Sequence, residues 1–380
     1  MKKKKKEKKI LYQLIFSAFL LFSNAYLVKA NSDILSQDST GKYCINTEQD
    51  YYNFIENIQN YNNKTVILCN DIDISDVPEA TSSFGGILNG KGHTITYASK
   101  EAKENIAVFP FRINDNGIVE NINVQIDESY AYNSETDEFQ TVFSRCDGIA
   151  KGITIKGNVT CIYDDEDTDV YIGAIEGNGT LMDSSIAITY DLQSEKTIEE
   201  IADDIVDNDL SFEFCQLGTI NTGITYQNCI GYGQYSEAIK SLADELEPKI
   251  KDNTWGYLCV SFTRKSFFST SASATNCYYD KENMPDIKIM SEYITNRDNN
   301  KEFPNYADFG KTTSEMKNQG TYEGFDFNKK WTISPEDNNG YPYYNPQTEE
   351  ITLKVQASTE PKVWSTSVPR DYNRFVDYAK

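Results

Sequence analysis

The stretch FGGILNGKGHTITY, residues 84–97, shows the sequence pattern that the rest of the chain repeats. Its centre, NGKG at 89–92, predicts a turn, because glycine tolerates positive φ and asparagine is the next most tolerant residue. Residues 93–97 then alternate polar and apolar side chains, the period of a strand with one buried face. Upstream, VILCNDIDIS at 66–75 shows the same alternation. This strand, turn and strand unit cannot bury its apolar face alone, so the rest of the chain must cover it.

Three later segments align without gaps and repeat this pattern. Their glycines, Gly117, Gly148 and Gly179, are separated by two intervals of 31 residues. A fixed period of this length is typical of a solenoid, and the strand pattern within each period indicates a β-solenoid. We expect each glycine to occupy a turn with an unusual φ. The aligned segments are NGIVENI (116–122), DGIAKGI (147–153) and NGTLMDS (178–184).

A second column of equivalent positions contains short polar side chains. In a parallel stack, amides at one corner can hydrogen-bond from one rung to the next, as in the asparagine ladders of fibrils. We therefore interpret this column as structural, with ligand contacts as the alternative. Its members are Asn121, Asp183, Asn228 and Asn276.

Three segments have helical patterns. TEQD at 47–50 resembles a capping box, and apolar residues then recur at helical spacing through Ile58, which predicts a short helix that covers the N-terminal end of the stack. Two insertions, 195–210 and 236–250, also show helical spacing. Such insertions either carry the binding surface of a repeat protein or are tolerated surface loops.

The N-terminal segment 1–30 predicts a secretory signal, with a basic start, an apolar run and the cleavage sequence Val28-Lys29-Ala30. An uncleaved anchor is the alternative, since the apolar run could just span a bilayer. Residues 31–42 read as a flexible segment and 346–380 as a strand with a polar tail. After cleavage we expect no membrane span.

The chain has 380 residues and a net charge of −22. Loss of the signal, with its eight lysines and one glutamate, would lower the charge to −29. Such a charge repels nucleic acid and anionic membrane surfaces, so we expect neither as a partner.

All eight cysteines follow the signal segment, and an even number in an exported chain permits four disulfides. Buried thiols are the alternative. Cys146 and Cys161, fifteen residues apart, are the best candidates for a bridge. Cys229 and Cys277 follow two asparagines of the corner column, and we expect them to be buried neighbours in the reduced state.

The chain resembles the secreted and surface proteins of Gram-positive bacteria that carry the GLUG motif. This resemblance covers residues 44–344 and implies a right-handed parallel β-helix with an adhesin-like role at the cell surface. The family provides no established catalytic residues. The segments that carry the resemblance are CNDIDIS (69–75), 84–97, IGAIEGNGTL (172–181), NCYYD (276–280) and 310–344.

Few residues suggest metal or acid–base chemistry. His93, the one histidine, reads as a turn residue because its sequence neighbours offer no catalytic or metal partner. Acidic residues echo a calcium loop, but valine stands where the loop needs glycine, so a solvated acidic corner is the competing interpretation. Arg112 and Arg145, the basic residues of successive rungs, are expected out of register. The calcium candidates are Asp165, Asp167, Asp169 and Glu176.

We therefore expect an all-β fold, a right-handed parallel β-helix over 43–345 with a short N-terminal capping helix and two small helical insertions. The expected role is a secreted or cell-surface, non-enzymatic binding protein that recognises an extracellular glycan or a host or bacterial surface protein. Trp255 and the many tyrosines could stack on sugar rings. The alternative is an extracellular polysaccharide lyase or glycoside hydrolase on the same scaffold, and a third possibility is a structural spacer. No catalytic or cofactor-binding residue is assigned.

Overall fold

The structure is a computed structural model, and the part it describes lies in the first of two compact units, Met1–Pro346. Residues 1–30, which the sequence predicts to be a signal, and the tail 346–380 lie outside the described residues. Within the described residues no helix is long and apolar enough to cross a membrane. The described residues are 35–75, 77, 80, 82–98, 107–131, 139–163, 168–218, 223–251, 254–261, 273–285, 287–289, 291 and 309–345.

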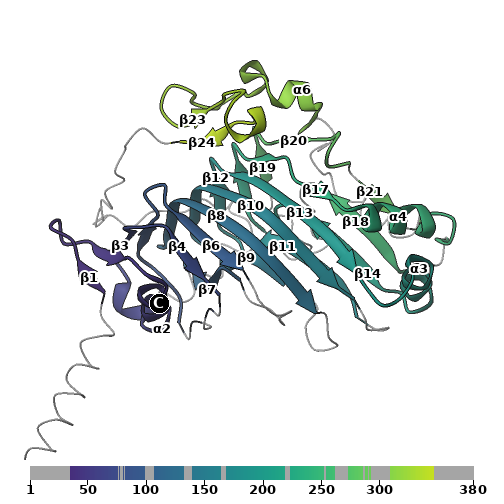
Figure 1. Ribbon diagram of the computed structural model, residues 1–380, viewed down its shortest axis with the longest axis horizontal. Coiled ribbons are helices and arrows are strands. Elements are labelled where there is room, and N and C mark those ends of the chain that lie inside the picture. Colours follow the sequence, from purple (N-terminus) through teal and green to yellow (C-terminus); the bar gives the residue numbers. More distant parts are fainter. Residues whose placement is uncertain are drawn as a thin grey trace, which may run out of the picture. The chain divides into compact units, whose positions relative to one another are not determined.

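The protein is rich in β-structure, and its strands form large, mostly parallel sheets (Figure 1). Sixteen strands form the largest sheet: β1 (Ser36–Gln37), β2 (Tyr43–Ile45), β3 (Thr65–Leu68), β4 (Ile72–Ile74), β5 (Ile87–Asn89), β6 (Thr94–Ala98), β8 (Ile118–Ala131), β10 (Ile149–Ile162), β12 (Thr180–Met182), β13 (Ser185–Gln193), β15 (Thr225–Gln227), β16 (Ile230–Gly231), β17 (Gln234–Tyr235), β19 (Ser273–Thr275), β20 (Tyr278–Asp280) and β22 (Gly310–Lys311).

From β7 onward, strands of a second, six-stranded sheet alternate along the chain with strands of the large sheet. Its strands are β7 (Phe109–Ile113), β9 (Phe139–Cys146), β11 (Val170–Ile175), β14 (Ser211–Cys215), β18 (Tyr257–Ser261) and β21 (Ile287–Ile289). The short strands β23 (Trp331–Thr332) and β24 (Tyr343–Tyr344) form a two-stranded ribbon. Among the described strands only the pairs β1–β2, β18–β21 and β23–β24 are antiparallel.

The 31-residue interval in the sequence is the register of the central strands. Ile155 of β10 pairs with Val124 of β8 on one side and with Ile186 of β13 on the other. All three side chains are buried in the main hydrophobic core. Because side chains alternate along a strand, the residues between them face outward. The period therefore gives both the pairing and the buried face.

The three repeated glycines are needed for space, and the expectation of an unusual φ was wrong. None of them is among the residues with positive φ. A Cβ at Gly148 would lie 2.3 Å from the carbonyl oxygens of Asn114 and Gly117, and one at Gly179 would lie 2.1 Å from the oxygen of Gly148. We call each repeated unit of strands a rung. The backbone of each rung approaches the next so closely that a side chain cannot enter.

Positive φ values occur at the corner column instead. Asn121, Asp183, Asn228 and Asn276 have φ between 49° and 55°, and Gly152 occupies the same corner with φ of 63°. The expected ladder is confirmed over three rungs. The Asn228 Nδ2 donates to Asp183 Oδ1 at 3.0 Å, and the Asn276 Nδ2 donates to Asn228 Oδ1 at 3.4 Å. Asparagine suits these positions because its backbone adopts the left-handed region more readily than that of most residues, and because its side-chain amide can hydrogen-bond to the next residue of the column.

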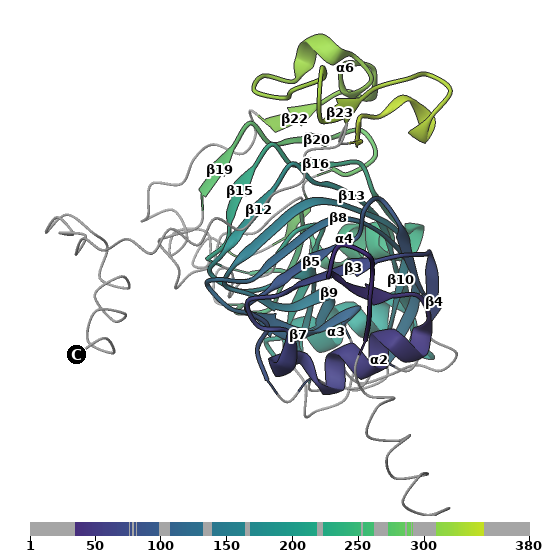
Figure 2. The ribbon, with the colours of Figure 1, turned by 90° about the vertical axis from the view of Figure 1, so that its left-hand side faces the viewer.

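The expected helix at the N-terminal end is confirmed as α2 (Glu48–Glu56), followed by the 3₁₀ turn η1 (Ile58–Tyr61). Thr47 caps α2 by accepting a hydrogen bond from the Asp50 amide at 3.2 Å. Figure 2 looks onto this end and shows α2 in the foreground. The buried Phe54 ring meets those of Phe84 and Phe111 edge to face, so the helix closes the hydrophobic core there.

Both expected helical insertions are confirmed, as α3 (Ile198–Asp207) and α4 (Glu237–Leu246). Thr197 and Glu200 form a capping box at the start of α3. The two helices lie side by side (Figure 1). An ion pair of 2.7 Å joins Lys249, just after α4, to Asp203 of α3.

The last described segment, 309–345, contains β22, the helix α6 (Thr313–Met316), the 3₁₀ turns η3 (Gln319–Thr321) and η4 (Asn338–Gly340), and the ribbon β23–β24. It has its own hydrophobic cluster, in which Trp331 packs on Phe325 and Tyr344. Ile230 and Tyr278 of the large sheet belong to the same cluster. We call residues 309–345 the C-terminal segment.

The cysteines correct one expectation. Cys44 and Cys69 form a disulfide, whereas Cys146 is a buried thiol, so the expected Cys146–Cys161 bridge is wrong. Cys146 ends β9 in the small sheet, but Cys161 lies far along the 14-residue strand β10, about 40 Å from its start at ~3.3 Å per residue. Burial raises the pKa of the Cys146 thiol to about 12.

The expectation for the other cysteine pair is confirmed. Cys229 and Cys277 precede residues that pair directly in β16 and β20, and both are buried thiols. The side chains of stacked rungs run parallel, which does not suit the geometry of a disulfide.

Candidate functional site

The outward side chains of the large sheet form polar columns. Because successive rungs pair in register, Asn123 lies between Thr94 and Thr154, and Lys156 lies between Gln125 and Ala187. These residues alternate with the buried Val124 and Ile155. The sequence thus places hydroxyl, amide and amine groups at the 4.8 Å strand spacing on a rigid surface.

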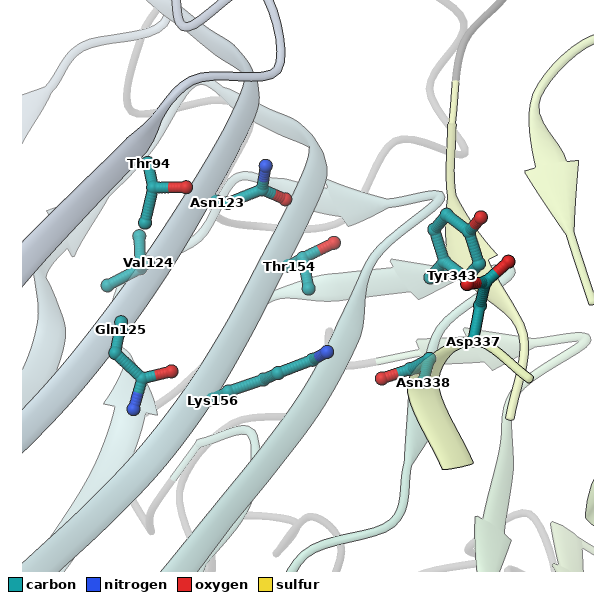
Figure 3. A pocket seen from close by; sticks show the side chains of 9 residues that line it. All are labelled: Thr94, Asn123, Val124, Gln125, Thr154, Lys156, Asp337, Asn338 and Tyr343. Atoms are coloured by element: carbon teal, nitrogen blue, oxygen red, sulfur yellow. The ribbon is translucent and has the colours of Figure 1, made fainter. Parts of the chain in front are cut away.

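The C-terminal segment covers part of this polar face and leaves two adjoining cavities of about 380 and 520 Å³. Both cavities are lined by Lys156 and Asn338, so together they form one groove. The strands provide its floor and the C-terminal segment provides its wall (Figure 3). The floor residues are Thr94, Asn123, Val124, Gln125, Thr154, Lys156, Ala187, Thr189, Gly233 and Gln234. The wall residues of the C-terminal segment are Glu336, Asp337, Asn338, Asn339, Tyr341 and Tyr343, and Asn283 and Tyr232 line the groove beside them.

An aromatic pair fixes the wall against the floor. The rings of Tyr232 and Tyr341 are stacked, with centroids 4.4 Å apart and planes 11° apart. The Asn338 Nδ2 donates to Tyr232 Oη at 3.0 Å and to the Tyr341 carbonyl at 3.2 Å. Burial raises the pKa of Tyr232 to about 12, so its hydroxyl remains protonated at neutral pH. The wall is therefore held in place before any ligand arrives.

A buried carboxylate anchors the same wall from behind. Asp280 is fully buried and accepts hydrogen bonds from the Tyr341 hydroxyl at 2.5 Å, the Thr313 hydroxyl at 2.8 Å and the Asn283 amide at 2.9 Å. The backbone amides of Glu282 and Asn283 donate to it as well. With so many donors, this carboxylate is a structural anchor and leaves Tyr341 oriented toward the groove.

Two contacts seat the C-terminal segment on the corner column. The Lys330 amine pairs with Asp183 at 3.2 Å. At the preceding rung, a Cβ on Gly152 would lie 2.2 Å from the ring of Tyr344, so the ring occupies the space that a side chain fills at the other corners. Glycine at this one corner thus makes room for the segment that builds the wall.

Lys156 is the cation of the groove floor. It is half buried, and Figure 3 shows its side chain extending from β10 toward Asn338. Within the described structure its ammonium has neither an ion pair nor a hydrogen bond. Burial lowers its pKa. The two acids of the wall, Glu336 and Asp337, are exposed at the rim.

This arrangement suits a ligand rich in hydroxyl groups. The amides of Asn and Gln both donate and accept hydrogen bonds, as do the threonine and tyrosine hydroxyls. Small-molecule pockets are usually lined mainly by apolar side chains, and this groove is not. A tyrosine ring at the wall adds an apolar face. Among the described residues, no cluster of histidine, cysteine and acidic side chains suits a metal ion.

The calcium candidates do not come together in the described structure. Asp165 and Asp167 lie outside the described residues. Asp169 accepts hydrogen bonds from the Ser211 amide at 2.6 Å and the Tyr171 hydroxyl at 3.2 Å. Glu176 pairs instead with Arg145 at 3.2 Å. These two carboxylates have structural partners on neighbouring rungs.

The basic residues and the histidine also have structural partners. Arg112 and Arg145 were expected out of register, but an irregularity between β7 and β9 pairs them directly, which corrects that expectation. Both approach Asp147, at 2.6 and 3.0 Å. His93 Nδ1 lies 3.0 Å from an oxygen of Asp71, next to the turn of the opening unit.

Sequence reasoning did not identify the groove. Strand parity around Lys156 could have placed that side chain, with Gln125 and Thr154, on the outward face. Nothing local indicates that residues 336–343 lie opposite them. Comparison with protein-family models, with curated proteins and with solved structures finds no match.

Proposed function

We propose that this chain is an exported, surface-associated protein that binds glycans in the groove between the polar sheet face and the C-terminal segment. The observation that carries the proposal is the lining of the groove. It is rich in amides, hydroxyls and tyrosine rings and has one amine, and its floor residues are held largely by strands whose spacing is fixed. Such groups match the closely spaced hydroxyls of sugars.

We further propose that the sheets are the walls of a right-handed parallel β-helix of the GLUG type. The 31-residue register of β8, β10 and β13 and the alternation of strands between the two sheets support this fold. The Cys44–Cys69 disulfide supports export, because such bonds persist in oxidising compartments. The signal segment and the adhesin-like role inferred from the resemblance agree with the same location.

A glycan array screened with the mature protein tests the binding function. We expect a restricted set of glycans to bind, and Gln125→Ala on the groove floor to weaken binding. Gln49→Ala is the matched control, because Gln49 is an exposed glutamine on α2 that does not line the groove. Equal loss in both variants, or no binding by the wild type, would contradict the proposal.

A reducing-end and unsaturated-product assay on the bound polysaccharides separates binding from turnover. A general acid for glycoside hydrolysis needs a carboxyl group that its surroundings keep protonated. The rim acids Glu336 and Asp337 are both exposed. We therefore expect binding without product. Release of new chain ends would support a lyase or hydrolase instead.

A further inference from the structure

Several lysines in the described structure form ion pairs with acidic side chains, and Lys156 does not. Lys196 pairs with Asp204 at 2.8 Å, and Lys249 pairs with Asp203 at 2.7 Å. Lys330 pairs with Asp183 on the corner column. Lys156 has no such partner among the described residues, although it is half buried. A cation that is partly removed from water without a counter-ion is unfavourable, so its retention in a groove points to a ligand that supplies the charge.

The neighbours of Lys156 suit one anionic group. Gln125 and Ala187 flank it in the same column, and the small alanine leaves the amine accessible from one side. Thr154 lies two residues before it on the same face. An anion over the amine would therefore receive hydrogen bonds from an ammonium, an amide and a hydroxyl.

The surroundings also limit how many charges the ligand can carry. Glu336 and Asp337 are at the rim of the same groove, and the whole chain has a net charge of −22. A second carboxylate on the next sugar would approach these acids and be repelled. Only one site in the described groove is cationic.

We propose that the groove selects an acidic sugar with an isolated anionic group, carboxylate or sulfate, seated on the Lys156 ammonium, with neutral sugars on either side. This inference rests on the proposed glycan-binding function. The amides and hydroxyls of the floor bind the neutral sugars, and Lys156 determines the choice of the acidic one. The acidic rim excludes densely charged chains.

The test is a glycan array with four classes of probe: neutral glycans, glycans with one carboxylated sugar, glycans with one sulfated sugar, and polyuronates. We expect wild type to prefer a singly charged class, and carboxyl reduction or desulfation to abolish that preference. Lys156→Met should weaken binding at least about tenfold, as when one member of a partly buried charge pair is removed. Lys156→Arg should retain the preference.

Lys240→Met is the control, because Lys240 lies on α4 outside the groove, its side chain is 41% exposed, and it forms an ion pair with Glu237. Circular dichroism and thermal melts check that each variant is folded. Preference for neutral glycans or polyuronates, or equal binding by wild type and Lys156→Met, would overturn this inference and leave glycan binding intact. If wild type binds no probe, glycan binding itself fails. Whether the anionic group is a carboxylate or a sulfate is shown by which of the two singly charged classes of glycan binds.

Discussion

Gly148 shows how closely the backbones of successive rungs approach each other. Its own φ is ordinary, yet a Cβ there would lie within 2.3 Å of two carbonyl oxygens. Backbone atoms cannot move aside as the end of a flexible side chain can. Glycine therefore recurs at this position because there is no space for a Cβ, and any larger residue must push two rungs apart.

We predict that Gly148→Ala lowers the free energy of unfolding by about 1–3 kcal/mol, the usual cost of overpacking. Gly320→Ala is the control, since the nearest atom to a Cβ there is a side-chain oxygen of Asn318 at 3.3 Å. We expect the control to change stability by less than about 0.5 kcal/mol. Urea melts of both variants give the comparison. Equal midpoints would show that the rungs can separate freely at Gly148.

Asp147 is a residue whose charge the fold stabilises. Its side chain is only 6% exposed, and burial alone would raise its pKa. The hydrogen bond from Arg145 and the charges of Arg145 and Arg112 outweigh burial and leave the pKa below its usual value. A carboxyl group with a depressed folded-state pKa stabilises the fold above its unfolded pKa. That stabilisation is lost as the pH falls through the folded-state pKa.

We therefore predict that Asp147→Asn destabilises the protein at pH 7 by about 1–3 kcal/mol, because two guanidinium groups lose their shared acceptor. Below pH 4 the variant and the wild type should converge, because the wild-type carboxylate is then being protonated. Thermal melts from pH 2 to pH 7 measure the difference. Asp244→Asn, at an exposed site on α4, should show no such pH dependence. A difference in melting temperature between wild type and Asp147→Asn that stayed constant across this pH range would show that protonation of Asp147 is not linked to stability.

The corner column determines where each strand turns into the next one. Asn228 has φ of 52°, and its amide donates to Asp183 on the preceding rung. Alanine in the left-handed region costs roughly 1–2 kcal/mol, whereas glycine adopts it freely. Both substitutions remove the side-chain amide of Asn228 and its hydrogen bond to Asp183. Their difference therefore isolates the backbone requirement of the corner.

We predict that Asn228→Gly is more stable than Asn228→Ala, by about 1 kcal/mol. The adjacent Gln227 is the exposed last residue of β15, where the order should reverse because glycine weakens a strand. Chemical denaturation of the four variants decides the matter. If alanine were better than glycine at both positions, the corner would not need its left-handed conformation.

Elements with local signals were predicted well. Thr197 and Glu200 mark the start of α3 in the sequence, and the structure contains that capping box. The same local logic identified α2, α4 and the strand period. It failed for Cys146 and Cys161, because sequence spacing does not reveal that β10 continues for 14 residues and carries Cys161 away. It also failed for Arg112 and Arg145, since an irregular strand pair changed their register.

The groove depends on contacts between distant parts of the sequence. Lys156 is on a strand whose parity the sequence reveals, but Asn338 lies opposite it because the C-terminal segment docks on the large sheet. The ion pair between Lys330 and Asp183 spans 147 residues. No local pattern encodes such a contact. The floor could therefore be predicted from the repeat, and the wall could not.

The docking of the wall depends on the missing side chain of Gly152. We predict that Gly152→Asn releases the C-terminal segment, because asparagine fits a φ of 63° but its side chain would occupy the place of the Tyr344 ring. Trp331, 2% exposed in the cluster beside Tyr344, should then meet water. Its fluorescence should shift to longer wavelength in a background that also carries Trp255→Phe and Trp364→Phe.

The matched test is the double variant of Gly152→Asn with Tyr344→Ala. If the two side chains compete for one space, Tyr344→Ala alone should weaken docking, but it should add little to Gly152→Asn. Glycan binding should fall together with the fluorescence shift, because the wall of the groove leaves with the segment. Two results would contradict this prediction: unchanged Trp331 emission in Gly152→Asn, or fully additive effects of Gly152→Asn and Tyr344→Ala. Either result would show that other contacts hold the C-terminal segment and that glycine at this corner is not needed to form the groove.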